Sequence, residues 1–365
     1  MIRVLHVVTY MGRGGLETMI MNYYRNIDRS QIQFDFLTHR DFKADYDDEI
    51  ESMGGIIYNL PPLNPFSASY RKALSKFFDK HTEYKIIHVH QDCMSSVILK
   101  EAYKQGVPVR VAHSHNCSQD KNAKYLIKLF YKKFISKYST HLFACSKEAG
   151  DWMFGQTKFK VINNAIDASK YTYNENMRKK MRQKFELSVE ELLIGHVGRF
   201  NLPKNHSYLL DVFQLVQSSV KAKLFLVGDG YLRNEIEKKI QMLGLEDKVI
   251  LAGVCDNVNE ILQAIDVFLF PSLYEGLPVS IVEAQASGLP CLISDKVPIE
   301  CKKTDLVYQM NLTDSAEKWA DKVIELSKIK RVNTYEQIKA SGYDIKENAK
   351  MLTDFYIEEY NKIIK

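Results

Sequence analysis

The chain has 365 residues, which is long for one hydrophobic core, so we expect two domains. Hydrophobic residues make up 45% and charged residues 26%, the composition of an ordinary globular protein. No apolar run reaches the roughly 20 residues that cross a bilayer, and the amino terminus lacks the apolar core and cleavage site of a signal peptide. We therefore expect a cytoplasmic protein and exclude an integral membrane protein.

The formal net charge is +5, and it is unevenly distributed. Residues 1–170 carry 24 basic and 17 acidic side chains, a charge of +7, which leaves −2 for the rest. A basic half favours a polyanionic partner such as an anionic membrane or a phosphate-bearing acceptor. No nucleic-acid-binding module is recognisable, so nucleic acid is not an expected partner. The six cysteines form no CxxC pair, which indicates a reducing compartment without disulfides or a zinc site.

Short apolar runs alternate with helical patterns through the first half of the chain. Apolar spacing near 3.6 predicts helices, as at Gly15–Arg25 and Ala68–Lys80. This alternation is typical of parallel sheets that helices cover on both faces. The predicted strands are Val4–Tyr10, Gln33–Thr38, Ile86–His90, Val109–His113 and His141–Ala144.

A glycine-rich turn, Gly12 to Glu17, joins the first strand to the first helix. Gly14 and Gly15 precede the helix, where free backbone N–H groups can bind phosphate. The dinucleotide fingerprint GxGxxG would require glycine at position 17, so Glu17 disfavours a nicotinamide dehydrogenase. No GKS or GKT follows, so the turn is not a P-loop either.

The strand predicted at Val109–His113 ends in His113-Ser114-His115-Asn116. Such histidines can ligate a metal, transfer protons or bind a substrate, although an isolated histidine more often has a structural role. No His, Cys or Asp set at ligand spacing accompanies them, so we expect no metal. Asp45-Tyr46-Asp47 looks like a DxD metal motif, but no strand leads into it, and we interpret it as a solvated face.

Basic and aromatic residues interleave at helical spacing between Lys121 and Tyr138. This pattern predicts either an interfacial helix on an anionic membrane or a packed amphipathic helix whose lysines extend to solvent.

The segment from Asp167 to Glu191 is polar and highly charged, and we interpret it as a linker that leads into a second domain. Beyond it the alternation of strands and helices resumes, with helices at His206–Val216 and Leu232–Leu243. Two Rossmann-like domains that face each other across a cleft, with ligand at the carboxyl ends of the strands, would explain this organisation. The predicted strands are Leu193–Val197, Lys223–Val227, Val249–Leu251, Val267–Phe270 and Pro290–Ile293.

The loops after these strands should share one edge of the sheet. Their basic side chains could neutralise a diphosphate and their glycines could admit a nucleotide. Each basic side chain alone is more often a solvated surface charge, and a simple tight turn explains the glycines after the second strand equally well. The residues are Gly198, Arg199, Lys204 and Asn205 after the first strand, Gly228 and Gly230 after the second, and Gly253 after the third.

The strongest pattern follows Val267–Phe270 and runs from Glu275 through Gly276, Leu277 and Pro278. Pro278 should open a helix from Val279 to Ser287, whose amino terminus forms an anion site. Glu283 in this helix could accept hydrogen bonds from the two hydroxyls of a ribose, and Glu275 could do the same for a sugar. A capped surface helix is the alternative explanation of the segment alone.

Together these motifs resemble the retaining glycosyltransferases of family four, which have the GT-B fold. The similarity spans nearly the whole chain and includes the Glu-x7-Glu pattern of Glu275 and Glu283. Ala144-Cys145-Ser146-Lys147 and the segment 161–167 look like those of bacterial exopolysaccharide and capsule members. The resemblance implies domains at 1–166 and 167–345, with a tail helix at 346–365 that packs back on the first domain.

The resemblance also implies roles for the candidate residues. Arg199 and Lys204 would hold the departing diphosphate, Glu283 the ribose, and Glu275 with the backbone of Gly276–Val279 the donor sugar. Gly14 and Gly15 would lie against donor phosphates or acceptor. The family's cleft histidine matches His115, with His113 as the alternative. Asn164-Ala165 departs from the more usual Asn-Gly, which affects only a turn.

The implied function is retaining, metal-independent transfer of a sugar from a nucleotide-diphosphate donor, UDP favoured over GDP. The acceptor would be a glycan or a lipid-linked oligosaccharide of bacterial surface polysaccharide synthesis, at the inner face of the membrane. A sugar-nucleotide epimerase or phosphorylase of the same fold is the alternative, and a non-enzymatic nucleotide-sugar sensor is a third hypothesis.

Overall fold

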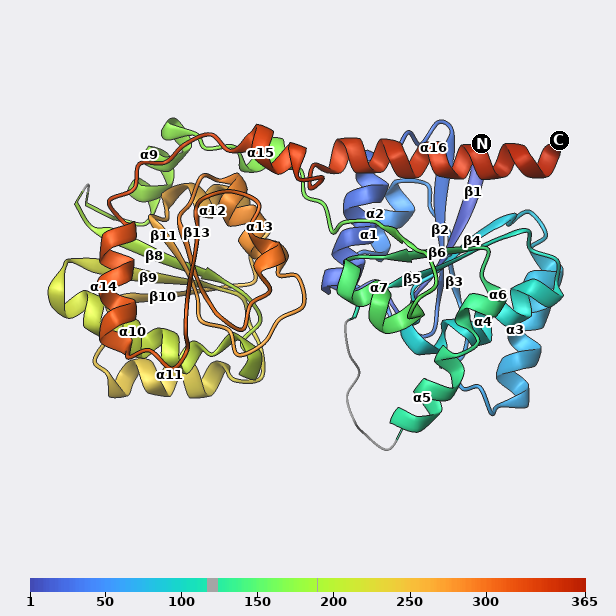
Figure 1. Cartoon of the computed structure of the whole chain (residues 1–365), viewed down its shortest axis with the longest axis horizontal. Helices are drawn as coiled ribbons and strands as arrows, with labels where there is room; N and C mark the ends of the chain where they lie inside the picture. Colours follow the sequence, from blue (N-terminus) through green and yellow to red (C-terminus); the bar gives the residue numbers. More distant parts are fainter. Residues whose placement is uncertain (117–123, 189) are drawn as a thin grey trace. The chain divides into compact units, whose positions relative to one another are not determined.

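The computed structural model describes residues 1–116, 124–188 and 190–365, which divide into two compact units (Figure 1). The first unit contains Met1–Ala165 and Ile345–Lys365, and the second contains Ile166–Asp344. Among the described residues, no helix is long and apolar enough to cross a membrane.

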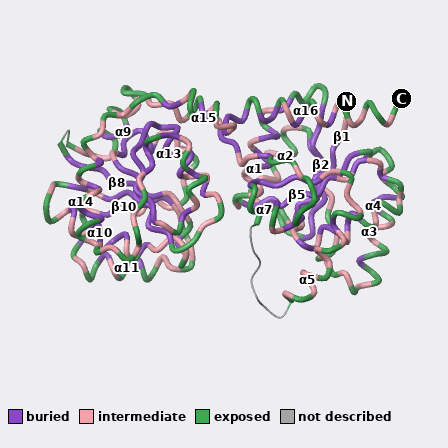
Figure 2. Tube along the Cα trace, viewed as in Figure 1, coloured by how far each residue is buried: buried purple, intermediate pink, exposed green. Residues whose placement is uncertain are grey.

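The first unit is built on a seven-stranded parallel sheet with the order β3-β2-β1-β4-β5-β6-β7. Its strands are largely buried, which agrees with their nearly continuous apolar sequences (Figure 2). The sequence missed β3 and β7 because they are short and form the two edges. The strands are β1 (Ile2–Val7), β2 (Ile32–Thr38), β3 (Ile57–Asn59), β4 (Ile86–Val89), β5 (Val109–Ser114), β6 (His141–Ala144) and β7 (Lys160–Val161).

Helices cover both faces of this sheet. Apolar residues of α1 and α16 form the core on one face, and those of α3, α4 and α7 form the core on the other. The helices are α1 (Gly15–Asn26), α2 (Asp47–Ser52), α3 (Ala68–Lys80), α4 (Ser95–Lys104), α5 (Tyr125–Lys132), α6 (Ile135–Tyr138), α7 (Lys147–Phe154) and α16 (Ile345–Ile364), with a 3-10 turn η1 at Asp92–Met94.

The second unit repeats the plan with six parallel strands in the order β10-β9-β8-β11-β12-β13. One face packs against α10, α11 and α14, and the other against α9, α12 and α13. The strands are β8 (Leu192–Val197), β9 (Ala222–Val227), β10 (Val249–Gly253), β11 (Val267–Phe270), β12 (Cys291–Ser294) and β13 (Val307–Met310). The helices are α8 (Ala168–Tyr171), α9 (Glu175–Lys184), α10 (His206–Ser219), α11 (Arg233–Met242), α12 (Val258–Ala264), α13 (Val279–Ala286), α14 (Ala316–Leu326) and α15 (Tyr335–Ala340), with 3-10 turns η2 (Leu202–Lys204) and η3 (Ile299–Cys301).

The interpretation of Asp167–Glu191 as a linker was wrong, because α8 and α9 lie in it and pack on the second unit. The sequence analysis interpreted its charged residues as a sign of a solvated linker, but the arginines are packed. The guanidinium groups of Arg178 and Arg182 donate to the carboxylate of Asp266 at 2.5 and 3.1 Å, and Arg182 also bonds backbone carbonyls. The charged residues therefore fasten α9 to the sheet.

The α16 helix packs on the first unit, although it follows the second unit in the chain (Figure 1). Leu352 and Tyr356 enter the core beside α1. The hydroxyl of Tyr356 forms a 2.6 Å hydrogen bond with Nδ1 of His88 on β4. The two points where the chain passes between the units lie together, because Ile166 pairs with Asp344 in a parallel bridge.

Candidate functional site

The predicted donor-binding loops of the second unit lie at one edge of its sheet, because β8, β9, β10 and β11 run parallel. Backbone hydrogen bonds tie the loops together. The N–H of Gly198 donates to the carbonyl of Val227 at 2.9 Å, and the N–H of Gly228 donates to that of Gly253 at 2.8 Å. The loops thus form a connected rim at the carboxyl ends of the strands, where open α/β sheets bind ligands.

The glycines of this rim differ in what surrounds them. A Cβ at Gly228, whose φ is +134°, would lie 2.1 Å from the carbonyl oxygen of Gly198, and one at Gly230 would lie 2.3 Å from that of Phe200. These two glycines therefore let two loops of the chain approach each other. No atom would lie within 4 Å of a Cβ at Gly253 or Gly276, so the backbone is open there.

Lys204 and Glu275 meet in an ion pair. Nζ of Lys204 donates to Oε1 of Glu275 at 2.7 Å, and the two side chains are only 16% and 12% exposed. The ammonium also lies over the ring of Phe270, 4.5 Å from its centroid. A carboxylate and an aromatic face thus hold the ammonium at the sheet edge, in a setting where a charge interacts more strongly than in water.

The α13 helix begins at Val279, as predicted, with Pro278 as its N-cap, and it ends at Ala286 rather than at Ser287. The cap makes no side-chain hydrogen bond, so the first N–H groups of α13 are available to an anion. Leu277 and Val279 pack against the small core under α13. Gly276 therefore opens toward solvent beside a helix amino terminus.

Glu283 lies in α13 and accepts a hydrogen bond at 2.8 Å from the hydroxyl of Tyr171. Burial raises the pKa of Glu283 above its usual value, and the bond from Tyr171 partly offsets this shift. The sequence did not identify Tyr171, because 112 residues separate it from Glu283. Tyr171 therefore fixes one oxygen of the carboxylate.

Arg199 and Asn205 complete the rim in different ways. The Arg199 side chain is exposed and makes no hydrogen bond or ion pair with the described residues. Asn205 has a left-handed conformation with φ of 53° and donates from its amide to the carbonyl of Pro271 at 3.1 Å. Asn205 therefore joins the loop after β8 to the loop after β11.

In the first unit, Gly14 is the N-cap of α1 and Gly15 its first residue, as the sequence predicts. The cap makes no side-chain hydrogen bond, and the space around a Cβ at Gly15 is open. Asp45 of the DxD-like segment accepts a hydrogen bond from the N–H of Arg13 at 3.2 Å. That segment therefore braces the glycine-rich turn.

His113 and His115 belong to a cluster of five histidines, which we call the histidine cluster: His6, His88, His90, His113 and His115. They lie on β1, β4 and β5 or, for His90 and His115, one residue beyond the strand end, and they alternate with residues that face α3 and α4, so they point toward α1 and α16. Their ring nitrogens pair at 2.9–3.0 Å: His6 with His90, His90 with His115, and His88 with His113.

Burial determines the charge of the histidine cluster. It lowers the pKa of His6 and of His115 to about 3, and lowers those of His88, His90 and His113 well below the usual value. The five rings are therefore neutral near pH 7.

The sequence argument against a metal assumed that no ligand set accompanies His113 and His115, and this premise was wrong. Nitrogens of His6, His88 and His90, and of His90, His113 and His115, lie within 4.8 Å of one another in each set. Neutral imidazole is a good transition-metal ligand, so both sets fit such an ion chemically. Parallel pairing of β1, β4 and β5 assembles the sets from distant parts of the chain.

A cavity of about 400 Å³, which we call the edge pocket, lies at the carboxyl ends of β1, β2 and β4 in the first unit. Asp92 in it has a left-handed φ of 46°, a strained conformation for a residue other than glycine, and accepts from the Asn116 amide at 2.9 Å. The sequence missed this pocket because its residues come from four separate loops and from the helices α1 and α5. Its polar lining residues are Thr9, His39, Arg40, His90, Gln91, Asp92, Cys93 and Lys128.

Comparison with known proteins identifies the family. The model described as Glycosyl transferases group 1 matches residues 177–344, and that of Glycosyltransferase Family 4 matches residues 13–170. The Bacillus subtilis (strain 168) protein described as glycosyltransferase EpsF is 36% identical over an alignment of 375 positions, which covers 97% of this chain and 96% of that protein. The UDP-Gal:alpha-D-GlcNAc-diphosphoundecaprenol alpha-1,3-galactosyltransferase of Escherichia coli is 29% identical over 228 residues, 59% of each chain.

The solved structure of Anabaena Alr3699/HepE in complex with UDP matches 100% of this chain and 98% of its own, with a TM-score of 0.73 at 16% identity. Such a likeness identifies the fold, and the family matches identify the class of protein. The chain therefore belongs to the glycosyltransferases of family four, and its two parallel-sheet units are the Rossmann-like domains of the GT-B fold.

Proposed function

We propose that the chain is a retaining, metal-independent glycosyltransferase that moves a sugar from a UDP-sugar to a glycan or a polyprenyl-diphosphate-linked oligosaccharide. The observation that most directly supports this proposal is the ion pair of Lys204 and Glu275, which lies at the sheet edge where α13 begins. The UDP complex of the HepE structure and the donor named for the Escherichia coli relative support UDP. The resemblance to exopolysaccharide and capsule members supports a role in bacterial surface polysaccharide synthesis.

Positive groups of the second unit would stabilise the leaving group. Breaking the glycosidic bond places negative charge on the nucleoside diphosphate. The guanidinium of Arg199, the ammonium of Lys204 and the first N–H groups of α13 would receive this charge without a metal ion. Removing one such donor typically costs about 10²–10³ in rate.

The carboxylates would bind hydroxyl groups. Glu283, with one oxygen held by Tyr171, would accept from the ribose, and Glu275 with the backbone of Gly276–Val279 would hold the donor sugar. Lys204 keeps Glu275 oriented for this task through their 2.7 Å hydrogen bond.

In the first unit, His115 would be the histidine that binds the transferred sugar, with His113 as the alternative. Burial lowers the pKa of His115 to about 3. A neutral imidazole at physiological pH can accept or donate one hydrogen bond but is not a proton donor of the imidazolium type. His115 would therefore position a hydroxyl, and Gly14–Gly15 would offer backbone N–H groups to phosphate or acceptor.

Transfer by an Arg199→Ala variant tests this proposal. The variant should bind the acceptor normally but lose transfer, and NMR of the wild-type product should show the anomeric configuration of the donor. Full transfer by Arg199→Ala would remove the diphosphate role, and an inverted product would remove the retaining mechanism. Incubation with donor alone addresses the alternative, because an epimerase would convert the sugar without acceptor.

We also propose that the chain works at the inner face of the cell membrane, through α5 and α6. The described part of the predicted interfacial segment forms these helices, whereas Lys121 lies outside the described residues. Lys128→Glu with Lys132→Glu should reduce cosedimentation with phosphatidylglycerol vesicles. Unchanged sedimentation would contradict this location.

A further inference from the structure

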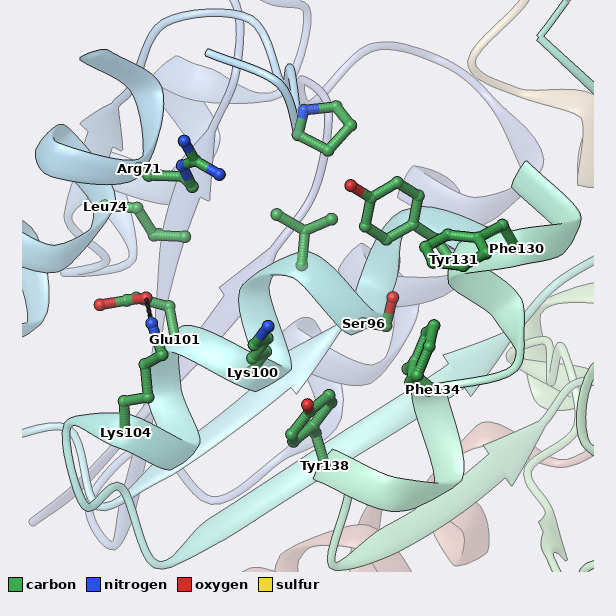
Figure 3. A pocket seen from close by; sticks show the side chains of 12 residues that line it. Arg71, Leu74, Ser96, Lys100, Glu101, Lys104, Phe130, Tyr131, Phe134 and Tyr138 are labelled. Carbon is green, nitrogen blue, oxygen red and sulfur yellow. Dashed lines mark hydrogen bonds and ion pairs between the residues drawn. The ribbon is translucent and has the colours of Figure 1, made fainter. Parts of the chain in front are cut away.

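A second cavity of the first unit, about 370 Å³ in volume, lies between α3, α4 and the α5–α6 segment (Figure 3). We call it the basic–aromatic pocket. Four aromatic side chains line one side and three cations line the other. The lining includes Phe130, Tyr131, Phe134 and Tyr138, opposite Arg71, Lys100 and Lys104.

The cations of this pocket are only partly compensated. Among the described residues, the guanidinium of Arg71 has no hydrogen-bond or ion-pair partner. Within the described part of the chain the Lys100 ammonium has no ion-pair partner and lies over the ring of Tyr138, 6.0 Å from its centroid. Lys104 lies 3.5 Å from Glu101, which is the one carboxylate in the lining. The pocket therefore carries an excess of positive charge and suits a ligand with two negative charges.

A buried hydroxyl also points into the pocket without a partner. Ser96 is 2% exposed, and its Oγ makes no hydrogen bond with any described residue. In Figure 3 this oxygen is directed toward the ring of Tyr131, on the aromatic side of the pocket. Buried hydroxyls almost always have a partner, and leaving one unsatisfied is costly. An acceptor oxygen on a ligand would supply the missing partner.

Large apolar side chains in and beside the pocket remain exposed. Leu126 of α5 is 76% exposed, Phe130 is 56% exposed, and Phe66 in the loop before α3 is 67% exposed. The ring of Phe66 packs edge-on against Tyr131, with centroids 6.4 Å apart. An anionic head inside the pocket could therefore continue into a hydrocarbon chain that lies on these side chains.

The basic–aromatic pocket adjoins the edge pocket. Lys128 lines the edge pocket and Tyr131, one helical turn later on α5, lines the basic–aromatic pocket. In the same way, Leu63 lines the edge pocket, and Pro65, two residues later, lines the basic–aromatic pocket. A molecule with a sugar and a lipid phosphate could therefore occupy both cavities, with its sugar at the sheet edge.

We propose that the basic–aromatic pocket binds the diphosphate of an isoprenoid lipid, the carrier end of the acceptor. This rests on the proposed function in taking the acceptor as lipid-linked. Arg71 and Lys100 pair with the phosphate oxygens, the Ser96 hydroxyl donates to one of them, and the isoprenoid chain leaves over Phe130 and Leu126. Recognition of the lipid end is thereby separate from recognition of the sugar.

Farnesyl diphosphate is a water-dispersible probe for this site, and its binding to the full chain can be measured by calorimetry. Arg71→Gln with Lys100→Gln should weaken binding about tenfold or more, since two charge-assisted hydrogen bonds are lost. Lys72→Gln with Lys76→Gln is the matched control on the exposed face of α3, and should leave the affinity unchanged. Ser96→Ala should weaken binding severalfold without lowering thermal stability.

Two partial ligands show which part of farnesyl diphosphate the pocket recognises. Farnesol and inorganic diphosphate should each bind much more weakly than farnesyl diphosphate, because each lacks half of the recognised chemistry. An equal loss in the control variant, or equal binding to phosphatidylglycerol vesicles and farnesyl diphosphate with the same dependence on Arg71 and Lys100, would overturn the proposal.

UDP binding by the same variants keeps this result separate from the donor chemistry. It should be unchanged in the Arg71–Lys100 double variant, because the predicted donor residues lie in the second unit. Normal UDP binding without farnesyl diphosphate binding in the wild type would overturn the pocket proposal alone. Loss of transfer from UDP-sugar to every acceptor would count against the proposed function instead.

Discussion

Nζ of Lys204 donates a 2.7 Å hydrogen bond to Oε1 of Glu275, so each of these two predicted donor-site residues is the counter-ion of the other. One follows β8 and the other follows β11, which are neighbours in the sheet. Because both side chains are largely buried, removing one charge leaves the other uncompensated.

Lys204→Gln should therefore reduce kcat by about 10²–10³, as expected for loss of one donor to a departing anion. Lys221→Gln is a matched control at the amino end of β9, where the lysine is 64% exposed, and should keep wild-type kinetics. Steady-state transfer assays give both values. A rate loss of the same size in the control would show that the effect is not specific to the rim.

Tyr171→Phe should shift the acid limb of UDP affinity to higher pH. Glu283 must be ionised to accept from ribose, and burial already raises its pKa, whereas the Tyr171 hydroxyl lowers it. Removing that hydroxyl raises the pKa further, so the carboxylate protonates earlier as the pH falls. Calorimetric titration of UDP between pH 5 and 8 measures the shift, and Glu283→Gln should remove the part of the pH dependence that comes from this carboxyl and leave the part that comes from the UDP phosphate, whose pKa is about 6.

If Glu283→Gln instead retained both the affinity and its pH dependence, Glu283 would not bind the ribose. Thermal stability separates this result from misfolding. A buried carboxyl with a raised folded-state pKa binds more protons than in the unfolded chain, so its contribution to stability falls as the pH rises. Glu283→Gln should therefore not lower the melting temperature near pH 7.5.

The first unit should lose stability as the pH falls below about 6.5. The folded-state pKa values of the histidine cluster are depressed, so the unfolded chain binds more protons below that pH and unfolding is favoured. Each histidine should contribute about 1.4 kcal/mol per pH unit until the pH nears its folded pKa. Urea unfolding followed through Trp152, in a Trp319→Phe background, measures the slope.

A variant of the cluster makes that prediction specific. His6→Asn should reduce the dependence of the unfolding free energy on pH by the contribution of one histidine, about 1.4 kcal/mol per pH unit. His81→Asn, which removes a histidine paired with Glu83 outside the cluster, is the comparison. A flat stability profile between pH 7 and 5 in the wild type would contradict the burial of five neutral rings.

Chelation should leave transfer intact if the diphosphate is neutralised by Arg199, Lys204 and α13. The expected result is an equal transfer rate before and after dialysis against EDTA. A rate that falls with EDTA and returns with a divalent ion would contradict the metal-independent mechanism. The His90→Asn variant would then locate the ion, because His90 belongs to both candidate ligand sets.

Most of the sheet architecture could be predicted from the sequence, because buried parallel strands are nearly continuous apolar runs. The predicted strands at His141–Ala144 and Val267–Phe270 agree with β6 and β11 at both ends. The edge strand β7 has two exposed residues and therefore gives no apolar signal. The prediction for the segment containing α9 was wrong for a different reason. Its arginines were interpreted as solvated charges, whereas they form hydrogen bonds that pack the helix on the sheet.

The candidate site was predictable only where a motif is contiguous. The residues from Glu275 to Glu283 form one loop and helix, so spacing alone predicts the helix and its anion site. The hydrogen-bond partners of His115 and Glu283 could not be predicted from the spacing of residues in the sequence. His90 becomes a neighbour of His115 only through the pairing of β4 with β5, and Tyr171 reaches Glu283 only through the packing of α8 on α13.

The position of α16 has a consequence for biosynthesis. The second unit consists of one continuous stretch, Ile166–Asp344, so it can fold as soon as that stretch has left the ribosome. The first unit must wait, because Leu352 and Tyr356 fill its core and are made about 180 residues after the rest of it. Until then the face of β1 and β2 beside α1 is uncovered, and a nascent chain stalled before residue 345 presents this face to chaperones. The order of synthesis thus makes the first unit the last to mature.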